Sequence, residues 1–158
     1  MVTNYDGKII DLTDERVSYL QMIQSAIDRM STSSALFKGF AAAIIAGIIV
    51  VSLSELSATL VVCSLIPLIL FAVMDTYYLQ LEKRYRYVFS QVRSGKKDCD
   101  FDMSPPTVKE ILKNDKGAKV RWYHCICSPS IWMFYGPMVI ACLTLLCFVL
   151  FNRMTPNT

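Results

Sequence analysis

The stretch that decides the fold is residues 39–74, GFAAAIIAGIIVVSLSELSATLVVCSLIPLILFAVM, in which Glu55 is the only charged residue. Apolar runs of roughly 18 or more residues without a charge are typical of transmembrane helices. Glu55 divides the stretch into two such runs, which predict spans from about 36 to 53 and from about 56 to 75. Because the polar link between them is very short, we expect an antiparallel hairpin.

A third uncharged stretch runs from Trp122 to Asn152 and is interrupted only by the titratable His124. It predicts a span over about residues 131–151. The chain has 158 residues, of which 54% are hydrophobic and 18% are charged, whereas soluble domains carry about 25% charged residues. Since a chain this short cannot wrap three such helices in protein, the pattern predicts an all-α membrane protein with three transmembrane helices.

An amphipathic helix is predicted ahead of the first span. Apolar residues recur at spacings of three and four from Val17 to Met30, and Asp11 or Thr13 can cap the start of this helix. Residues 1–10 are expected to be irregular, and residues 31–34 to form a polar break or a soft helical joint. The residues that fit heptad a and d positions are Leu20, Ile23, Ile27 and Met30.

This apolar face has three possible partners. It could pack on the protein's own loop segment, lie on the membrane, or pair with copies of the chain. Two heptads do not make a coiled coil by themselves, but their spacing favours a helix–helix contact inside an oligomer.

No helix breaker follows the second span, and apolar residues keep a helical spacing to about Arg93. One long helix is therefore predicted to leave the membrane and to end at Ser94–Gly95. A polar insert follows, with a short helix from Thr107 to Lys113 that Thr107 or Ser104 can cap. The predicted segments are 1–35, the N-terminal amphipathic helix; 36–76, the transmembrane hairpin; 77–130, the helix and basic insert; and 131–158, the third span and a short outer tail.

Charge asymmetry predicts the orientation in the membrane. Residues 77–130 contain eleven Lys and Arg residues against six Asp and Glu residues. The link between the first two spans has no basic residue, and Arg153 is the only one in the C-terminal tail. By the positive-inside rule, the N-terminus and the 77–130 segment face the cytoplasm and the C-terminus faces outward. We expect no cleavable signal, because the first apolar run follows an acidic, polar segment.

Residue types that carry catalysis are scarce in this sequence. There is one histidine, and the motifs HExxH, GxSxG and the Gly-rich phosphate loop do not occur, so we expect no catalytic residues and no cofactor. Alternating acids at Asp98, Asp100 and Asp102 could bind a divalent cation, but they lack the glycine and closing glutamate of a calcium loop. A CxC pair next to His124 is a weak metal signal. No metal site is predicted.

Polar and small residues in the spans suggest where a pore or gate could form. Asp75, at the inner end of the second span, is either a structural partner of Lys38 or a functional gate. Glu55, at the outer tip, is either a turn residue or part of an acidic ring that favours cations in an oligomer. Small residues four apart from Gly39 onward allow close helix contact. The predicted pore or gate residues are Ala43, Gly47, Ser52, Glu55 and Asp75.

Basic and aromatic residues of the insert could bind an anionic partner such as lipid, nucleic acid or an acidic protein. Lys109 and Lys113 share a helix face, and nearby aromatic rings would allow base stacking as well as phosphate contact. The alternative is that the basic residues only fix the topology. The predicted nucleotide-binding or nucleic-acid-binding residues are Lys96, Lys97, Lys109, Lys113, Lys116, Lys119, Arg121 and Trp122.

Several strings of this sequence resemble one family of small bacterial membrane proteins. They are YLQMIQSAIDRMSTSSALFKGF at 19–40, VMDTYYLQLEKRYRYVFSQV at 73–92, DFDMSP at 100–105 and SPSIWMFYGPMVI at 128–140. Phe40 and Ser33 replace the Trp and Asn that are usual in that family, which weakens any role assigned to these two positions. The strings resemble the SLATT-like membrane effectors of bacterial defence operons, and among them the channel effector of Hailong anti-phage systems.

The resemblance implies a homo-oligomeric ion channel with a cytoplasmic crown. It further implies that a bound single-stranded DNA oligomer or nucleotide signal, made by a partner nucleotidyltransferase, holds the channel closed. Loss of that ligand would open the channel, depolarise the inner membrane and kill the cell. Two alternatives remain open: a non-conducting scaffold that anchors a cytosolic defence partner at the bilayer, and a lipid-binding regulator.

Overall fold

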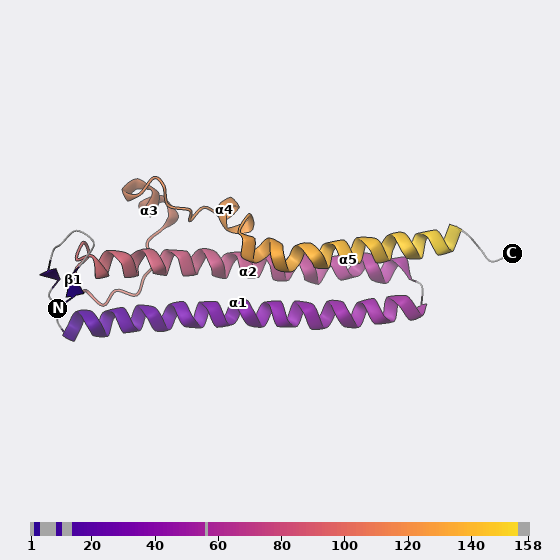
Figure 1. The fold of residues 1–158 in the computed structure, drawn as a ribbon, viewed down its shortest axis with the longest axis horizontal. Coiled ribbons are helices and arrows are strands. Elements are labelled where there is room, and N and C mark those ends of the chain that lie inside the picture. Colours follow the sequence, from indigo (N-terminus) through magenta and orange to yellow (C-terminus); the bar gives the residue numbers. More distant parts are fainter. Residues whose placement is uncertain (1, 4–8, 11–13, 56, 155–158) are drawn as a thin grey trace. The chain divides into compact units, whose positions relative to one another are not determined.

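The computed structural model describes residues 2–3, 9–10, 14–55 and 57–154. The helices in this part of the chain are α1 (Asp14–Glu55), α2 (Ala58–Arg93), α3 (Val108–Asn114), α4 (Trp122–Ile126) and α5 (Pro129–Met154) (Figure 1). Two short strands, β1 (Val2–Thr3) and β2 (Ile9–Ile10), pair antiparallel with Val2 opposite Ile10. The sequence predicts an irregular segment over residues 1–10. It does not reveal these strands, because two residues are too few to show the alternation of apolar and polar side chains that identifies a strand.

The fold class predicted from the sequence is confirmed. α1, α2 and α5 are each long and apolar enough to cross a membrane. In the most apolar window of α1 only 11% of the residues are buried within the chain, and the share is 22% in both α2 and α5. Apolar surface exposed on this scale needs a surrounding of lipid or protein. The chain is therefore an all-α membrane protein.

α1 continues without interruption through the segment where the sequence suggested a polar break. The Thr32 hydroxyl donates to the carbonyl of Asp28 at 2.9 Å, and the Ser33 hydroxyl donates to that of Arg29 at 3.0 Å. Side-chain bonds to the carbonyl four residues earlier let Ser and Thr remain inside a helix. The polar break is therefore wrong, and one helix joins the N-terminal residues to the first span.

α2 is the single long helix that the sequence predicted. It contains Pro67 and ends at Arg93, where the Gly95 amide bonds to the Val92 carbonyl at 3.1 Å and the Lys96 amide to that of Gln91 at 3.0 Å. Gly95 has φ of +71°, a left-handed conformation that a residue without a Cβ adopts at little cost. The predicted stop at Ser94–Gly95 is confirmed.

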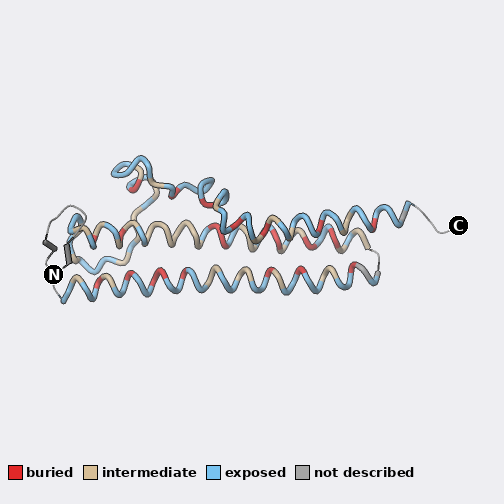
Figure 2. Tube along the Cα trace, in the orientation of Figure 1, coloured by how far each residue is buried: buried red, intermediate tan, exposed pale blue. Residues whose placement is uncertain are grey.

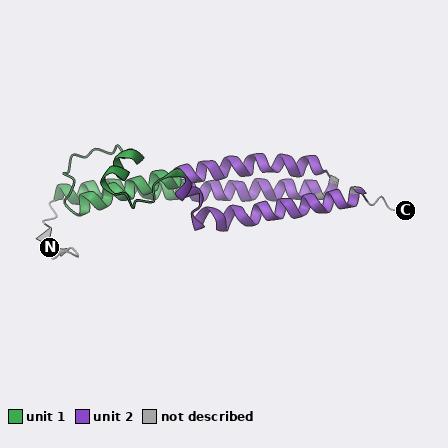
Figure 3. Ribbon diagram, turned by 90° about the horizontal axis from the view of Figure 1, so that it is seen from above, with its two compact units in different colours: residues 1–33, 78–122 green, residues 34–77, 123–158 purple. Residues whose placement is uncertain are grey.

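The chain divides into two compact units (Figure 3). Unit 1 consists of residues 1–33 and 78–122, and unit 2 of residues 34–77 and 123–158. α1 and α2 each contribute residues to both units. The sequence predicts an insert that extends to residue 130. In the structure unit 1 ends at Trp122, so most of α4 belongs to unit 2.

The core of unit 1 joins the N-terminal part of α1 to the C-terminal part of α2. Its buried residues are Tyr19, Ile23, Ile27, Val88 and Val92. The apolar face of the N-terminal helix thus packs on the chain's own α2, one of the three partners that the sequence allowed. The preferred interpretation, a contact between copies, is wrong for Ile23 and Ile27, because α2 already covers them.

Unit 2 buries a narrow face of each apolar helix, and the remaining residues are intermediate or exposed (Figure 2). Ala41 and Ile45 of α1 are buried there, together with Leu68 of α2 and Ile131 of α5. Between α2 and α5, the Ser64 hydroxyl and the Cys142 thiol lie 3.6 Å apart. Small polar residues at such contacts let membrane helices approach closely and hydrogen-bond.

Candidate functional site

A loop of unit 1, residues 94–107 between α2 and α3, is fastened to the helices through its backbone carbonyls. We call it the connecting loop. The Tyr19 hydroxyl of α1 donates to the Asp102 carbonyl at 2.5 Å, and the Tyr85 hydroxyl of α2 donates to that of Met103 at 3.0 Å. The guanidinium of Arg84 donates to the carbonyls of Pro105 and Pro106, both at 2.9 Å. Four carbonyls of one loop are therefore held by three side chains.

Lys97 links the connecting loop to α1. Its ammonium donates to the Tyr19 hydroxyl at 3.3 Å and lies 3.4 Å from the Asp100 carboxylate. Burial by itself would lower the pKa of Lys97, but the Tyr19 hydroxyl and the Asp100 carboxylate outweigh it and raise that pKa above its ordinary value. Lys97 is therefore fully charged at neutral pH.

Phe101 lies in the same loop with φ of +52°. Its ring lies 5.4 Å from the Tyr19 ring, centroid to centroid. A residue with a Cβ in the left-handed region costs about 1–3 kcal/mol and persists only when its surroundings hold it. The contacts of Tyr19 with the loop are such a surrounding, so the loop conformation depends on α1.

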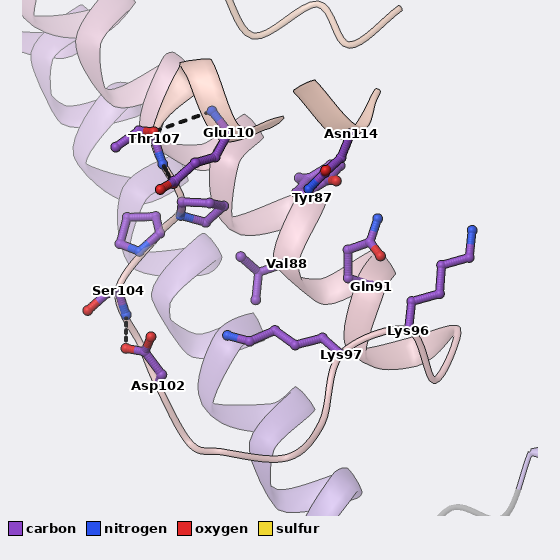
Figure 4. A pocket seen from close by; sticks show the side chains of 12 residues that line it. Tyr87, Val88, Gln91, Lys96, Lys97, Asp102, Ser104, Thr107, Glu110 and Asn114 are labelled. Atoms are coloured by element: carbon purple, nitrogen blue, oxygen red, sulfur yellow. Dashed lines mark hydrogen bonds between the residues drawn. The ribbon is translucent and has the colours of Figure 1, made fainter. Parts of the chain in front are cut away.

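A cavity of about 510 Å³ opens between the end of α2, the connecting loop and α3 (Figure 4). We call it the loop cavity. Lys97 extends across it toward the side of Asp102, whereas Tyr87 and Asn114 lie at the other end. Both cationic and anionic side chains line it. Its lining residues are Tyr87, Val88, Gln91, Lys96, Lys97, Asp102, Ser104, Pro105, Pro106, Thr107, Glu110 and Asn114.

The acidic residues around the loop cavity accept hydrogen bonds from backbone amides. The Asp102 carboxylate accepts from the Ser104 amide at 2.8 Å, and the Glu110 carboxylate accepts from the Thr107 amide at 2.7 Å. These amide bonds are the main reason that the pKa values of both carboxyl groups lie below their ordinary range. Both residues are therefore ionised at neutral pH.

The second bond belongs to a capping box at the start of α3. The Thr107 hydroxyl accepts from the Glu110 amide at 3.4 Å, while the Glu110 side chain reaches back to the Thr107 amide. Such reciprocal bonds satisfy two amides that the first turn of a helix leaves free. Capping by Thr107, one of two residues predicted for this role, is confirmed.

The predicted nucleotide-binding residues fall into two groups. Lys96 and Lys97 line the loop cavity. The remaining six are exposed on α3, on the segment that follows it and at the start of α4. These six are Lys109, Lys113, Lys116, Lys119, Arg121 and Trp122.

In unit 2, Asp75 forms the ion pair that the sequence suggested with Lys38. The Lys38 ammonium lies 2.6 Å from the Asp75 carboxylate, and the Asp75 side chain is fully buried. Ser34 completes the cluster: its hydroxyl donates to Asp75 and accepts from Lys38 at 2.8 Å. A buried carboxylate is tolerated when its charge is paired in this way. This geometry supports the structural alternative for Asp75.

Tyr135 brings α5 to the same cluster. Tyr135 is 5% exposed, and its hydroxyl is buried. The hydroxyl interacts electrostatically with Asp75. The ion pair of α1 and α2 thus has a polar neighbour on the third span.

The three residues predicted for a pore face on the first span differ in exposure. Ala43 and Gly47 are exposed, whereas Ser52 is fully buried within unit 2. Nine residues separate Ala43 from Ser52, which is about two and a half helical turns, so their side chains point to opposite sides. Glu55 ends α1, and its side chain lies outside the described part of the chain.

Metal ligands do not gather in the described part of the chain. No group of three or more His, Cys, Asp or Glu side chains there could hold a metal ion. The carboxylates of Asp100 and Asp102 instead bond amides of their own loop at 3.1 and 2.8 Å. The six cysteines are free thiols.

Several residues of the site were missed by sequence reasoning. Tyr19 lies one turn before Ile23 on the buried face of α1, so the helical spacing could have identified it. Arg84 was counted only as one of the basic residues that set the topology. Tyr87 and Gln91 are one turn apart on α2, but only the path of the connecting loop reveals that they line a cavity.

In comparisons with known proteins, no family model, no curated protein and no solved structure matches this chain.

Proposed function

We propose that copies of this chain assemble into an ion channel whose conductance is controlled by a nucleotide or single-stranded DNA ligand bound to unit 1. The observation that carries the proposal is the position of Lys97. It lines the loop cavity and also donates to Tyr19 of α1, and α1 continues as the first span. A ligand that binds Lys97 would therefore act on a helix that crosses the membrane.

The mechanism is a shift between two populations. A ligand stabilises whichever state of the channel binds it more tightly, and it changes the equilibrium only by that difference in affinity. In the resemblance given above, the bound DNA favours the closed state. Loss of the DNA then opens the channel and depolarises the membrane, which makes the chain an effector of anti-phage defence.

The proposal includes an orientation. The segment 77–130 contains eleven basic and six acidic residues. This excess of basic residues supports an orientation in the bacterial inner membrane in which unit 1 faces the cytoplasm. This side of the membrane is where a partner nucleotidyltransferase would make the ligand.

The test is the membrane potential of bacteria that express the chain without a partner enzyme. We expect a voltage-sensitive dye to report depolarisation as the protein accumulates. The control is Ile45→Arg, which puts a charge on the buried face of the first span and should prevent the helices of unit 2 from packing, so that no channel forms. The channel would be contradicted if the membrane potential stayed unchanged although the wild-type protein was shown to be present in the membrane.

One observation favours a second candidate function, a non-conducting anchor for a cytosolic defence partner. The buried polar side chains of the spans, Ser52, Ser64 and Asp75, face the inside of unit 2, while large apolar residues such as Val50 and Ile66 are exposed. A single copy with such a surface can be embedded in a bilayer, because its apolar side chains face the lipid, and it needs no aqueous pore. The anchor predicts an unchanged membrane potential and a stable protein partner.

A further inference from the structure

An apolar groove of about 560 Å³ lies in unit 2, where α4 leads into α5. We call it the α4–α5 groove. Ile126 and Cys127 line it at the end of α4, together with α5 residues between Ile131 and Ile140. None of the lining residues in the described part of the chain is charged. A ligand with charged groups would lose its bonds to water there without replacing them, so the groove suits an apolar occupant.

Gly136 is the reason that α5 leaves room at this place. It lines the groove without a side chain, and a Cβ built on it would meet only the Trp132 ring, at 3.7 Å. Pro137 follows and removes an amide donor from the interior of the helix. An unfilled groove forfeits dispersion contacts along its walls, so an apolar group gains attraction by entering it.

The length of the groove matches one leaflet of a bilayer. The apolar span of α5 runs from Pro129 to Asn152, and the groove ends at Ile140, close to the middle of that span. From Ile131 to Ile140 the helix rises about 14 Å at 1.5 Å per residue, which is close to half of a hydrocarbon core of about 30 Å. A helix from a second copy would cross the whole core, whereas a single acyl chain ends near the midplane.

Exposed aromatic residues mark the outer end of the groove. Trp132, which lines it, is 65% exposed, and Tyr123 of α4 is 51% exposed. Trp and Tyr side chains collect at the level of the lipid headgroups. The groove therefore runs from the headgroup level toward the interior of the bilayer, which is the path of a phospholipid chain.

We propose that the α4–α5 groove binds one acyl chain of a phospholipid from the leaflet that α4 faces. The carbons next to the headgroup lie beside Trp132, and the end of the chain lies beside Ile140. Packing holds the chain in place, because lipid tails are as apolar as the side chains and the hydrophobic effect does not drive contacts inside a bilayer. This site goes beyond the proposed function and does not depend on whether the protein conducts ions.

Tryptophan fluorescence provides the test. The sequence contains two tryptophans, Trp122 and Trp132, so Trp122→Phe leaves Trp132 as the single reporter. Phospholipids with bromine on one chain, which quenches tryptophan on contact, are titrated into the delipidated full-length protein in detergent micelles. We expect quenching that saturates at one phospholipid per copy. Bromine next to the headgroup should quench Trp132 more strongly than bromine at the end of the chain.

Gly136→Leu, in the same background, fills the groove with a side chain. We expect this variant to bind the brominated phospholipid about tenfold more weakly. Ala141→Leu is the matched control, because Ala141 is exposed on the same helix and is not among the lining residues. It should bind the phospholipid like the parent protein. Size-exclusion chromatography checks that both variants keep the same assembly.

The site is ruled out if quenching rises in proportion to the added lipid without saturating, or if bromine at the end of the chain quenches Trp132 at least as strongly. Both results come from the unfilled groove, so they stay decisive even if Gly136→Leu fails to fold. Equal binding by Gly136→Leu and Ala141→Leu would also overturn the proposal. A brominated free fatty acid that binds more tightly than the phospholipid would overturn the choice of ligand. If Gly136→Leu alters the assembly and leaves lipid binding unchanged, the groove is a contact between copies instead.

Discussion

At the scale of single residues, the buried charge of Asp75 depends on two neighbours. Lys38 pairs with it and Ser34 donates to it. The sequence could suggest the pair because both residues lie near the same ends of adjacent, antiparallel spans. It could not identify Ser34, which looked like part of a polar break, because its role depends on α1 continuing as a helix.

Removing the positive partner should destabilise unit 2. We expect Lys38→Ala to lower the free energy of unfolding by roughly 3 kcal/mol, because it leaves a buried carboxylate unpaired. The measurement is thermal or denaturant unfolding in detergent micelles. The double variant Lys38→Met with Asp75→Leu removes both charges and should recover most of the loss. Equal losses in the single and double variants would show that the pair does not stabilise the fold in this way.

The carboxylates around the connecting loop predict a response to acid. The amides of Asp102, Ser104 and Thr107 hold the pKa values of Asp100, Asp102 and Glu110 below their ordinary range. Because the ionised forms are favoured in the folded loop, their stabilisation is complete above the ordinary values and is lost as the pH falls through the lowered ones.

We therefore expect protection of these amides from hydrogen exchange, corrected for the intrinsic rate, to stay constant from pH 7 to pH 5. It should fall only below the ordinary values of 3.8 for Asp and 4.5 for Glu. Asp102→Asn keeps a hydrogen-bond acceptor without the charge. In this variant, the hydrogen-exchange protection of the Ser104 amide should no longer change with pH. Protection that is already lost at pH 6 would contradict this account.

At the scale of elements, the sequence predicted the long helices well. Uncharged runs identified the spans, and the helical spacing after the second span correctly extended α2 to Arg93. What it missed were features that depend on distant contacts. The apolar face of the N-terminal helix fitted heptads, yet the structure packs it on α2 in the same chain, a choice that spacing alone cannot make.

The proposed coupling between ligand binding on unit 1 and conductance of the spans requires that α1 be continuous. Ser33→Pro should interrupt it, because proline removes an amide donor and clashes with the preceding turn at a cost of about 3 kcal/mol. We expect this variant to bind its ligand in unit 1 as before, while ligand no longer changes the conductance. Ser33→Ala, which favours a helix, is the control and should behave like the wild type. Normal ligand control of conductance in Ser33→Pro would show that α1 does not carry the coupling.

At the scale of the whole molecule, the charge asymmetry predicts which side of the membrane each part faces. In a variant without native cysteines, we expect an impermeant thiol reagent to label Lys116→Cys in inverted inner-membrane vesicles and not in spheroplasts. A cysteine at Asn157, in the C-terminal tail, should show the opposite pattern. Labelling of Lys116→Cys from the periplasmic side would reverse the proposed orientation and separate unit 1 from any cytoplasmic ligand.

The identity of a gating ligand is the property that the sequence supports least. Basic residues were spread from Lys96 to Arg121, and nothing in their spacing showed that Lys96 and Lys97 share a cavity with Gln91 and Asn114. The connecting loop brings them together. Its path depends on side chains from α1 and α2 that donate hydrogen bonds to its carbonyls. Such contacts between distant parts of the chain leave no local pattern in the sequence.

We propose that a ligand on unit 1 controls ion flow through the spans. The most direct measurement is the current across a planar bilayer containing the purified protein, before and after a single-strand nuclease is added to the side that unit 1 faces. We expect a low current that rises after digestion and falls again when an oligonucleotide is restored in the absence of nuclease. A bilayer that stays silent in both conditions, with the protein shown to be inserted, would contradict the channel, and a current indifferent to nuclease would contradict control by a nucleic acid strand.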